Sequence, residues 1–244
     1  MTLEIGHIQA LYRYPVKSMA GEQLDTANLG WHGLDGDRRF AFRRIQDQSG
    51  FPWLTASRLP DLILYKPVRL PESANDVLPT HVSTPDGRLL ALDSVELRDE
   101  IARRFGAEVQ LMHLRQGIFD ESPISIITVA TTRTITDESG VPADIRRFRP
   151  NIVIRTHGDE PFSEDQWVGK VLVLGSEENS PCVNVALRDE RCMMVNLNPE
   201  TARSDAAMMK TVVRLNQNYA GVYGTVIRTG LLMVGQKIFL RAMA

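Results

Sequence analysis

Residues 221–240 read GVYGTVIRTGLLMVGQKIFL, and this stretch carries the pattern that decides the fold. It contains two strand-like runs, 222–228 and 237–240, separated by a segment with the turn signal Val234-Gly235-Gln236. Short apolar or alternating runs bounded by Gly, Pro, Asn or Asp are typical of β-strands. The stretch therefore predicts two strands with a tight turn between them.

The same pattern recurs along the chain, with Pro85-Asp86-Gly87 as another turn signal. The other strand-like runs lie at 8–12, 39–43, 61–65, 109–112, 124–129, 151–155, 171–174, 183–187 and 193–196. Many short strands with little helix indicate a barrel or a sandwich. We therefore expect a mainly β fold, a β-rich α+β protein.

Few helices are expected. One spans 93–105, where Ser94 can cap the start and Gly106 can end the helix. A second begins near Thr131, and a third covers about 202–216. A domain boundary is expected within LRQGIFDES, residues 114–122, because one strand-like run ends there and another follows the Ser-Pro pair.

Composition excludes several classes of protein. With 28 Lys and Arg against 30 Asp and Glu, the net charge of −2 argues against a general nucleic-acid binder. The amino terminus lacks the apolar region of a secretory signal, and no run approaches the ~18 apolar residues of a membrane span. We expect a cytoplasmic protein with no membrane or nucleic-acid partner. The two cysteines are too few for a disulfide framework.

Cationic residues gather in three places in this slightly acidic chain. They are Lys17, the group Arg38, Arg39, Arg43 and Arg44, and the group Arg146, Arg147 and Arg149. Arg149 stands between Phe148 and Pro150 and leads into an apolar strand, so its guanidinium is expected to be partly buried. A buried cation needs an anionic partner. That partner is either an anionic ligand or an internal carboxylate.

Cys192 follows Arg191 and precedes an apolar run. An adjacent cation favours the thiolate, which is the form that binds soft or high-valent metals. A structural role is the alternative, since free cysteines are often buried. Cys182, in NSPCVNV, is expected to be a packing or loop residue.

Six motifs and the carboxyl-terminal stretch occur in an order that resembles a known family. The motifs are YPVKSMAG (14–21), GLDGDRRFAF (33–42), PWLTASRLPDL (52–62), RRFRPNIVI (146–154), PFSEDQWVGKVLVLG (161–175) and RCMMVNLNPETA (191–202). The chain resembles a member of the MOSC family, the molybdenum cofactor sulfurase C-terminal domain, preceded by that family's N-terminal β-barrel domain. The resemblance implies two packed β-barrel-like domains with a few short helices, 1–117 and 118–244, and a molybdenum cofactor, Mo-molybdopterin, between them.

The resemblance also implies a set of site residues. In the amidoxime-reducing members of the family a cysteine thiolate binds molybdenum, and their Arg-Cys pair falls on Arg191 and Cys192. Cys192 is therefore the expected metal ligand and catalytic residue. The expected cofactor-binding residues are Lys17, Arg38, Thr55, Ala56, Ser57, Arg149, Asn151 and Arg191. Cations suit the phosphate dianion of the cofactor, because charge-assisted hydrogen bonds are strong.

The implied function is reduction of small N-hydroxylated or N-oxygenated compounds. An iron-sulfur module would need more cysteines than the chain has, so electrons are expected from a separate ferredoxin- or flavin-type reductase. Two other functions stay open: a non-catalytic module that carries the cofactor, or sulfur on Cys192, and a nucleic-acid-binding barrel. Nothing in the sequence supports a pyridoxal phosphate site.

The chain departs from the family pattern at two places. Relatives often carry a second cysteine in PCSRC, whereas the stretch here reads VALRDERC and Cys182 lies ten residues before Cys192. The DPDTG turn of relatives is NPETA at 198–202, without the glycine that adopts a left-handed conformation readily. A different turn is expected after Cys192.

Overall fold

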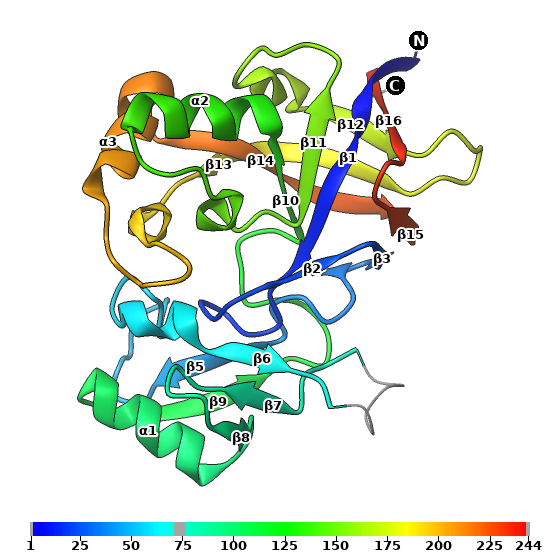
Figure 1. Cartoon of the computed structure of the whole chain (residues 1–244). Coiled ribbons are helices and arrows are strands. Elements are labelled where there is room, and N and C mark those ends of the chain that lie inside the picture. The colour runs from blue at the N-terminus through cyan, green and yellow to red at the C-terminus, as the bar shows by residue number, and fades with distance from the viewer. Residues whose placement is uncertain (1, 71–76, 243–244) are drawn as a thin grey trace.

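The computed structural model describes residues 2–70 and 77–242. Within these residues, seven strands close into a barrel in the order β11-β10-β14-β13-β12-β16-β1, and pairing of β1 with β11 completes the circle (Figure 1). The barrel strands are β1 (Thr2–Arg13), β10 (Ile124–Thr128), β11 (Ile152–Thr156), β12 (Lys170–Leu174), β13 (Cys182–Glu190), β14 (Tyr219–Arg228) and β16 (Lys237–Ala242). The first strand of the chain thus completes a barrel built mainly from its second half.

One pairing in the barrel is parallel, between β10 and β11, and helix α2 (Val129–Ser139) connects them. Parallel neighbours need such a crossover, whereas antiparallel neighbours can be joined by short turns. Side chains such as Ile126, Val183 and Val222 fill the barrel core. Helix α3 (Ala206–Asn216) packs beside α2 on the outside (Figure 1).

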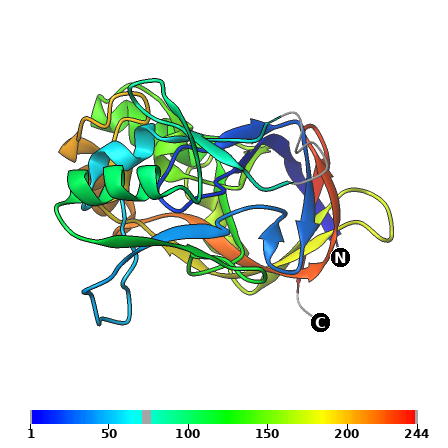
Figure 2. The same cartoon turned by 90° about the horizontal axis from the view of Figure 1, so that it is seen from below.

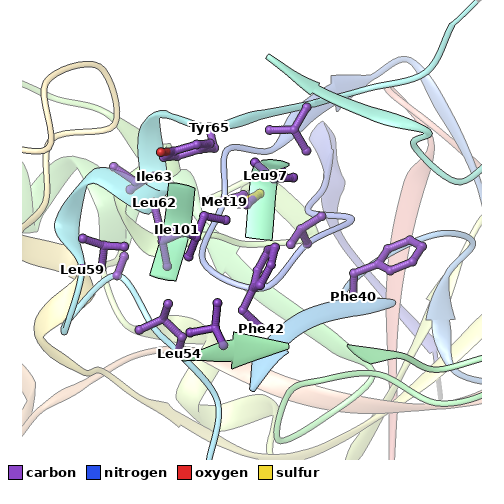
Figure 3. Close-up of a cluster of buried hydrophobic side chains, with 14 of the residues drawn as sticks. Met19, Phe40, Phe42, Leu54, Leu59, Leu62, Ile63, Tyr65, Leu97 and Ile101 are labelled. Atoms are coloured by element: carbon purple, nitrogen blue, oxygen red, sulfur yellow. The ribbon is translucent and has the colours of Figure 1, made fainter. Parts of the chain in front are cut away.

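Strand β2 (Glu22–Leu24) pairs with β1 in the barrel sheet. A small sheet of β3 (Thr26–Gly30), β4 (Gly33–Leu34) and β15 (Gly230–Met233) packs against the barrel core. Two more small sheets lie below the barrel in Figure 1: β5 (Phe40–Arg44) with β9 (Val109–His113), and β6 (Lys66–Val68), β7 (His81–Ser83) and β8 (Leu89–Ala91). Helix α1 (Val95–Phe105) covers a core in which Phe42, Leu62 and Leu97 meet (Figure 3). The expected β-rich fold with few short helices is confirmed.

Helix α1 has the predicted cap residues and the predicted end, and it begins at Val95, two residues after the predicted start at 93. The Ser94 hydroxyl accepts a hydrogen bond from the Leu97 N–H at 3.2 Å, and Gly106 ends the helix with a left-handed φ of 82°. These are the expected N-cap and C-cap interactions. The turns at 85–87 and 234–236 also separate strands, β7 from β8 and β15 from β16. The division of the chain at residue 117 stays a prediction.

Two predicted strands are wrong. Residues 61–65 lie mostly in the 3-10 helix η1 (Pro60–Leu64), and residues 193–196 form the 3-10 helix η5 (Met193–Asn196). An apolar run of four or five residues cannot distinguish a strand from a buried helical turn by periodicity. Pro60 at the first helical position favours the turn, because its φ is already helical. For η5, the Val195 N–H closes the turn on the Cys192 carbonyl at 3.2 Å.

The turn after Cys192 keeps a left-handed residue without a glycine. Ala202 stands where relatives have a glycine, and it still adopts the left-handed conformation, with φ 56°. Its N–H donates to the Asn198 carbonyl at 2.8 Å. A methyl group at such a φ costs roughly 1–2 kcal/mol. The hydrogen bond and the burial of Ala202 against the core below the barrel offset this cost.

Closure of the barrel leaves no room for a side chain at Gly6. Its φ is 155°, and an added Cβ would lie 2.0 Å from the Arg155 carbonyl oxygen on β11. We expect Gly6→Ala to lower the free energy of unfolding by about 1 to 3 kcal/mol through overpacking, measured by urea denaturation. Gly50→Ala is the control, since no atom lies within 4 Å of the added Cβ there. Equal stabilities of the two variants would contradict this account of closure.

Candidate functional site

A cavity of about 790 Å³ lies where the barrel and the small sheets meet. Its wall combines the YPVKS segment, the strand and loop around Trp53, the segment after β9, and the two sides of the barrel end at 147–149 and 189–195. Seven of the nine sequence-predicted site residues line it: Lys17, Arg38, Thr55, Ser57, Arg149, Arg191 and Cys192. The structure therefore brings together residues that are up to 175 positions apart in the chain.

The other two predicted residues are not on the cavity wall. Ala56 is fully buried in the core below the barrel. Asn151 is also fully buried, where its Oδ1 accepts hydrogen bonds at 3.0 Å from Arg38 Nη1 and from the Ser125 N–H. Asn151 thus positions Arg38, while Ala56, between Thr55 and Ser57 in the chain, packs in the core.

Arg38 is held by internal partners. Its Nη1 donates to Asp37 as well as to Asn151, its Nη2 donates to the Arg149 carbonyl at 3.0 Å, and its Nε lies 2.6 Å from Asp120 Oδ2. Burial opposes the charge of Arg38, but Asp37 and Asp120 raise its pKa overall. Arg38 is therefore a fixed cation whose donors are largely satisfied within the chain.

Arg149 differs from Arg38 because no carboxylate within the described residues lies within 4 Å of it. Its Nη1 donates to the Met19 carbonyl at 2.7 Å, and its guanidinium lies 4.2 Å from the centre of the Tyr14 ring. Burial, together with the smaller effect of the nearby charge of Arg38, lowers the pKa of Arg149 to about 10. The internal salt bridge considered for Arg149 is absent among these residues, so its charge is available to an anionic ligand.

Lys17 lies on the same side of the cavity. Its Nζ donates to the Phe119 carbonyl at 2.7 Å and lies 3.9 Å from Asp120 Oδ1. Burial lowers the pKa of Lys17, Asp120 opposes this effect, and Arg38 and Arg149 add to it. Lys17, Arg38 and Arg149 thus share a wall with the carboxylate of Asp120. Burial raises the pKa of Asp120, but Arg38 and Lys17 outweigh burial and hold it below the usual range.

Cys192 presents an exposed thiol at the start of η5. An electrostatic interaction with Cys192 opposes the lowering of the Lys17 pKa, so the two groups are close enough to interact. The preceding Arg191 is buried, where it donates to the Phe148 carbonyl at 2.6 Å and the Ala220 carbonyl at 2.7 Å. Arg191 therefore anchors the segment that carries Cys192. Cys182 lies in β13 with 1% of its surface exposed, as expected for a packing residue.

Asp189 is a cavity residue that sequence reasoning missed. It is 1% exposed, its Oδ2 accepts from Ser125 Oγ at 3.0 Å, and Arg191 Nη2 lies 2.8 Å away. Burial raises the pKa of Asp189 to about 6, although Arg191 and Ser125 act in the opposite direction. The sequence VALRDERC shows that Asp189 lies three residues before Cys192, but it does not show that the Asp189 side chain is buried.

Sequence reasoning also missed the apolar wall and Asp120. Phe51, Trp53 and Phe119 line the cavity together with Asp120. Phe119 and Asp120 lie in LRQGIFDES, a segment interpreted only as a boundary. The composition of residues 114–122 is typical of a connecting segment. No local pattern in it indicates that Phe119 and Asp120 belong to a site. Among the described residues, no three His, Cys, Asp or Glu side chains gather at a metal-binding distance.

The sequence matches two known protein-family domains. The MOSC domain matches residues 105–239, which is more than half of the chain, and the MOSC N-terminal β-barrel domain matches residues 5–115. The chain belongs to the MOSC family. Within the described residues of this MOSC protein, no helix is long and apolar enough to cross a membrane.

Individual relatives are distant. Mitochondrial amidoxime reducing component 2 from Bos taurus is 24% identical over 97% of this chain and 83% of its own length. Molybdenum cofactor sulfurase from Drosophila mojavensis is 24% identical over 83% of this chain, which corresponds to 29% of the sulfurase. The crystal structure of YUAD protein from Bacillus subtilis shares the fold of the MOSC chain, with 13% identity, a TM-score of 0.53, and coverage of 100% of this chain and 99% of that one.

Asp189 predicts a specific pH dependence of stability. Its folded pKa of about 6 lies above the roughly 3.9 of an unfolded Asp, so the folded chain binds this proton more tightly. The resulting stabilisation is full below about pH 4 and is lost as the pH rises through about 6. The stability of the wild type relative to Asp189→Asn should fall by about 2 to 3 kcal/mol between pH 4 and pH 7 in urea denaturation. Glu190→Gln, at an exposed neighbouring carboxyl, is the control. The same pH profile in both variants would contradict the assignment.

Proposed function

We propose that this chain is a molybdenum cofactor-binding oxidoreductase that reduces N-hydroxylated compounds with electrons from a separate protein. The observation that carries the proposal is the juxtaposition in one cavity of the exposed Cys192 thiol and Arg149, a cation without a carboxylate partner among the described residues. Membership of the MOSC family and similarity to an amidoxime reducing component and a molybdenum cofactor sulfurase support it.

The donor set fits a molybdopterin cofactor. A cavity of about 790 Å³ is in the range of pockets that hold cofactor-sized molecules. Arg149 and Lys17 offer charge to a phosphate, and Thr55 and Ser57 on the wall offer hydroxyl groups to a pterin. Cys192 offers the thiolate through which the metal of the cofactor would be held, a donor that hard cations such as Mg²⁺ and Ca²⁺ do not favour. Ala56 and Asn151 support these residues from behind the wall.

When bound, the cofactor supplies a metal that accepts and donates electron pairs, and the protein supplies orientation and electrostatics. Reduction of an N-hydroxyl compound to the amine breaks the N–O bond, consumes two electrons and two protons, and releases water. Arg191 holds the segment of Cys192 in place through its two carbonyl contacts. Arg38 and Asn151 fix the backbone around Arg149. We assign the electron donor to a ferredoxin- or flavin-type reductase, and a cytoplasmic location stays a prediction.

The exposed thiol of Cys192 also supports a second function. A thiol at a cavity mouth can carry sulfur as a persulfide, so the chain could serve as a sulfur or cofactor carrier. Stoichiometric molybdenum in protein purified from a cofactor-competent host favours the oxidoreductase, since a carrier needs no resident metal. Reduction of an N-hydroxylated compound with an artificial reductant then tests the reaction itself.

We expect Cys192→Ser to lower molybdenum-dependent reduction about a hundredfold or more, because serine is a poor substitute for a thiolate ligand. Cys182→Ser is the matched control. It places a hydroxyl in the barrel wall and lowers stability by about 1–3 kcal/mol, but it should retain activity per folded molecule. Activity assays and metal analysis of both variants check this. Equal losses in both, or full activity of Cys192→Ser, would contradict the assignment.

Arg149 provides a test that needs no substrate. Arg149→Ala should weaken cofactor binding roughly tenfold to a hundredfold, through loss of a charge-assisted contact of about 1.5–3 kcal/mol. Arg149→Lys should recover only part, because an ammonium lacks the planar fork of a guanidinium. Cofactor content and the melting temperature of the cofactor-free protein are measured together, with Arg155→Ala, on an exposed strand position, as control. A large drop in melting temperature with normal cofactor retention would contradict the role of Arg149.

A further inference from the structure

The cavity has a second wall that the proposed cofactor site does not use. This wall is apolar and is made by Phe51, Trp53 and Phe119. Phe51 and Trp53 come from the segment after β5, and Phe119 comes from the segment after β9. We call these three side chains the aromatic lip.

Two rings of the aromatic lip are firmly placed. The Trp53 and Phe119 ring centroids lie 4.6 Å apart with an interplanar angle of 66°, an edge-to-face arrangement. Trp53 pairs with Arg43 of β5 through a β-bridge. The Phe119 N–H donates to the Arg38 carbonyl at 2.9 Å, and the Phe119 carbonyl accepts from Lys17 Nζ. These contacts fix the rings beside the cation wall.

Phe51 extends the aromatic lip into solvent. It is 53% exposed although it lines the cavity, and its ring centroid lies 5.5 Å from Lys17 Nζ. The buried Arg44 holds its backbone, because Nη2 donates to the Phe51 carbonyl at 2.7 Å while the Arg44 side chain also pairs with Asp47. The loop between β5 and Trp53 projects from the body of the molecule in Figure 2. An aromatic ring is thus held at the cavity mouth with half of its surface uncovered.

The cations and the aromatic lip differ in how exposed they are to solvent, and this difference indicates which part of a ligand each one contacts. Arg38 is buried and Arg149 is half-buried, so the charged end of a ligand lies on the less exposed side of the cavity. Phe51 and Cys192 are exposed, so the mouth lies on their side. A compound that enters from solvent meets the exposed ring of Phe51 and the exposed Cys192 in the same cavity. The lip therefore faces the substrate, and the deep cations face the cofactor.

We propose that Phe51 and Trp53 make the cavity selective for N-hydroxylated compounds whose nitrogen is attached to an aromatic ring. This inference rests on the proposed function. A flat apolar ring covers the exposed face of Phe51 and packs against Trp53, gaining both burial and ring-to-ring contact. A small aliphatic hydroxylamine reaches neither side chain with comparable area.

The first experiment compares two substrates on the molybdenum-loaded protein. N-phenylhydroxylamine and N-methylhydroxylamine are each reduced to the amine and water, with two equivalents of reduced methyl viologen supplying the two electrons and solvent supplying the two protons. We expect the ratio of kcat/KM, phenyl over methyl, to fall about fivefold to twentyfold in Phe51→Ala, mainly through KM. Trp31→Ala, which removes an exposed tryptophan outside the cavity wall, should leave the ratio unchanged. Trp53→Phe gives a second test that keeps a ring at the inner position, and its ratio should fall less than that of Phe51→Ala.

A second measurement separates the aromatic lip from the reaction. Binding of aniline to the purified protein, measured by ligand-observed NMR, should weaken about fivefold or more in Phe51→Ala and stay unchanged in Trp31→Ala. Unchanged substrate ratio and unchanged aniline binding would overturn the selectivity while leaving the proposed function intact. Loss of molybdenum from Phe51→Ala would also overturn it, because the ring would then contact the cofactor. Aniline binding through Phe51 without any N-hydroxyl reduction by the wild type would refute the proposed function and keep the lip as an aromatic-binding surface.

Discussion

The cavity depends on the hydrogen bonds and ion pairs that the buried guanidinium of Arg38 makes. It joins three parts of the chain: Asp37 beside it, Asp120 from the segment after β9, and the barrel end through Asn151 and the Arg149 carbonyl. Removing a charge from water is costly unless several partners share it. Because Arg38 has these partners, its charge fixes how the small sheets meet the barrel. Its own φ of 46° and that of Arg149, 50°, bend the backbone at this junction.

Closure of the barrel puts the other elements within reach of this junction. Strand β1 pairs with β11 and β16 and then leads directly into the segment of Tyr14 and Lys17. Lys17 therefore reaches the cavity only a few residues after the end of β1. Tyr14, fully buried, lies under Arg149 and supports that guanidinium with its ring face. A cation held by an aromatic face and a carbonyl keeps its charge available for an anionic ligand.

The cavity combines two environments that serve different purposes. Its deep side is cationic, with burial lowering the pKa of both Lys17 and Arg149, and its mouth carries a thiol and aromatic rings. Burial also raises the pKa of Asp189 to about 6 on the barrel side of the same cavity. Cations, a buried carboxyl group and apolar surface are thus distributed over separate residues.

The sequence by itself determined the β-rich class, the family and the cap residues of α1, and seven of the nine site residues that it predicted line the cavity. These depend on local patterns: strand-like runs, Ser94 and Gly106 at helix ends, and motifs such as YPVKS and RC. The strand predicted at residues 193–196 is wrong, because a short apolar run fits a strand and a 3-10 helix equally well. Only the tertiary structure decided that Asn151 acts from behind the wall and that Asp120 shares Arg38 with Asp37. It alone placed Phe51 beside Lys17 and buried Asp189 next to Arg191, because burial, pKa and contact between distant segments depend on packing of the whole chain, which no local pattern encodes.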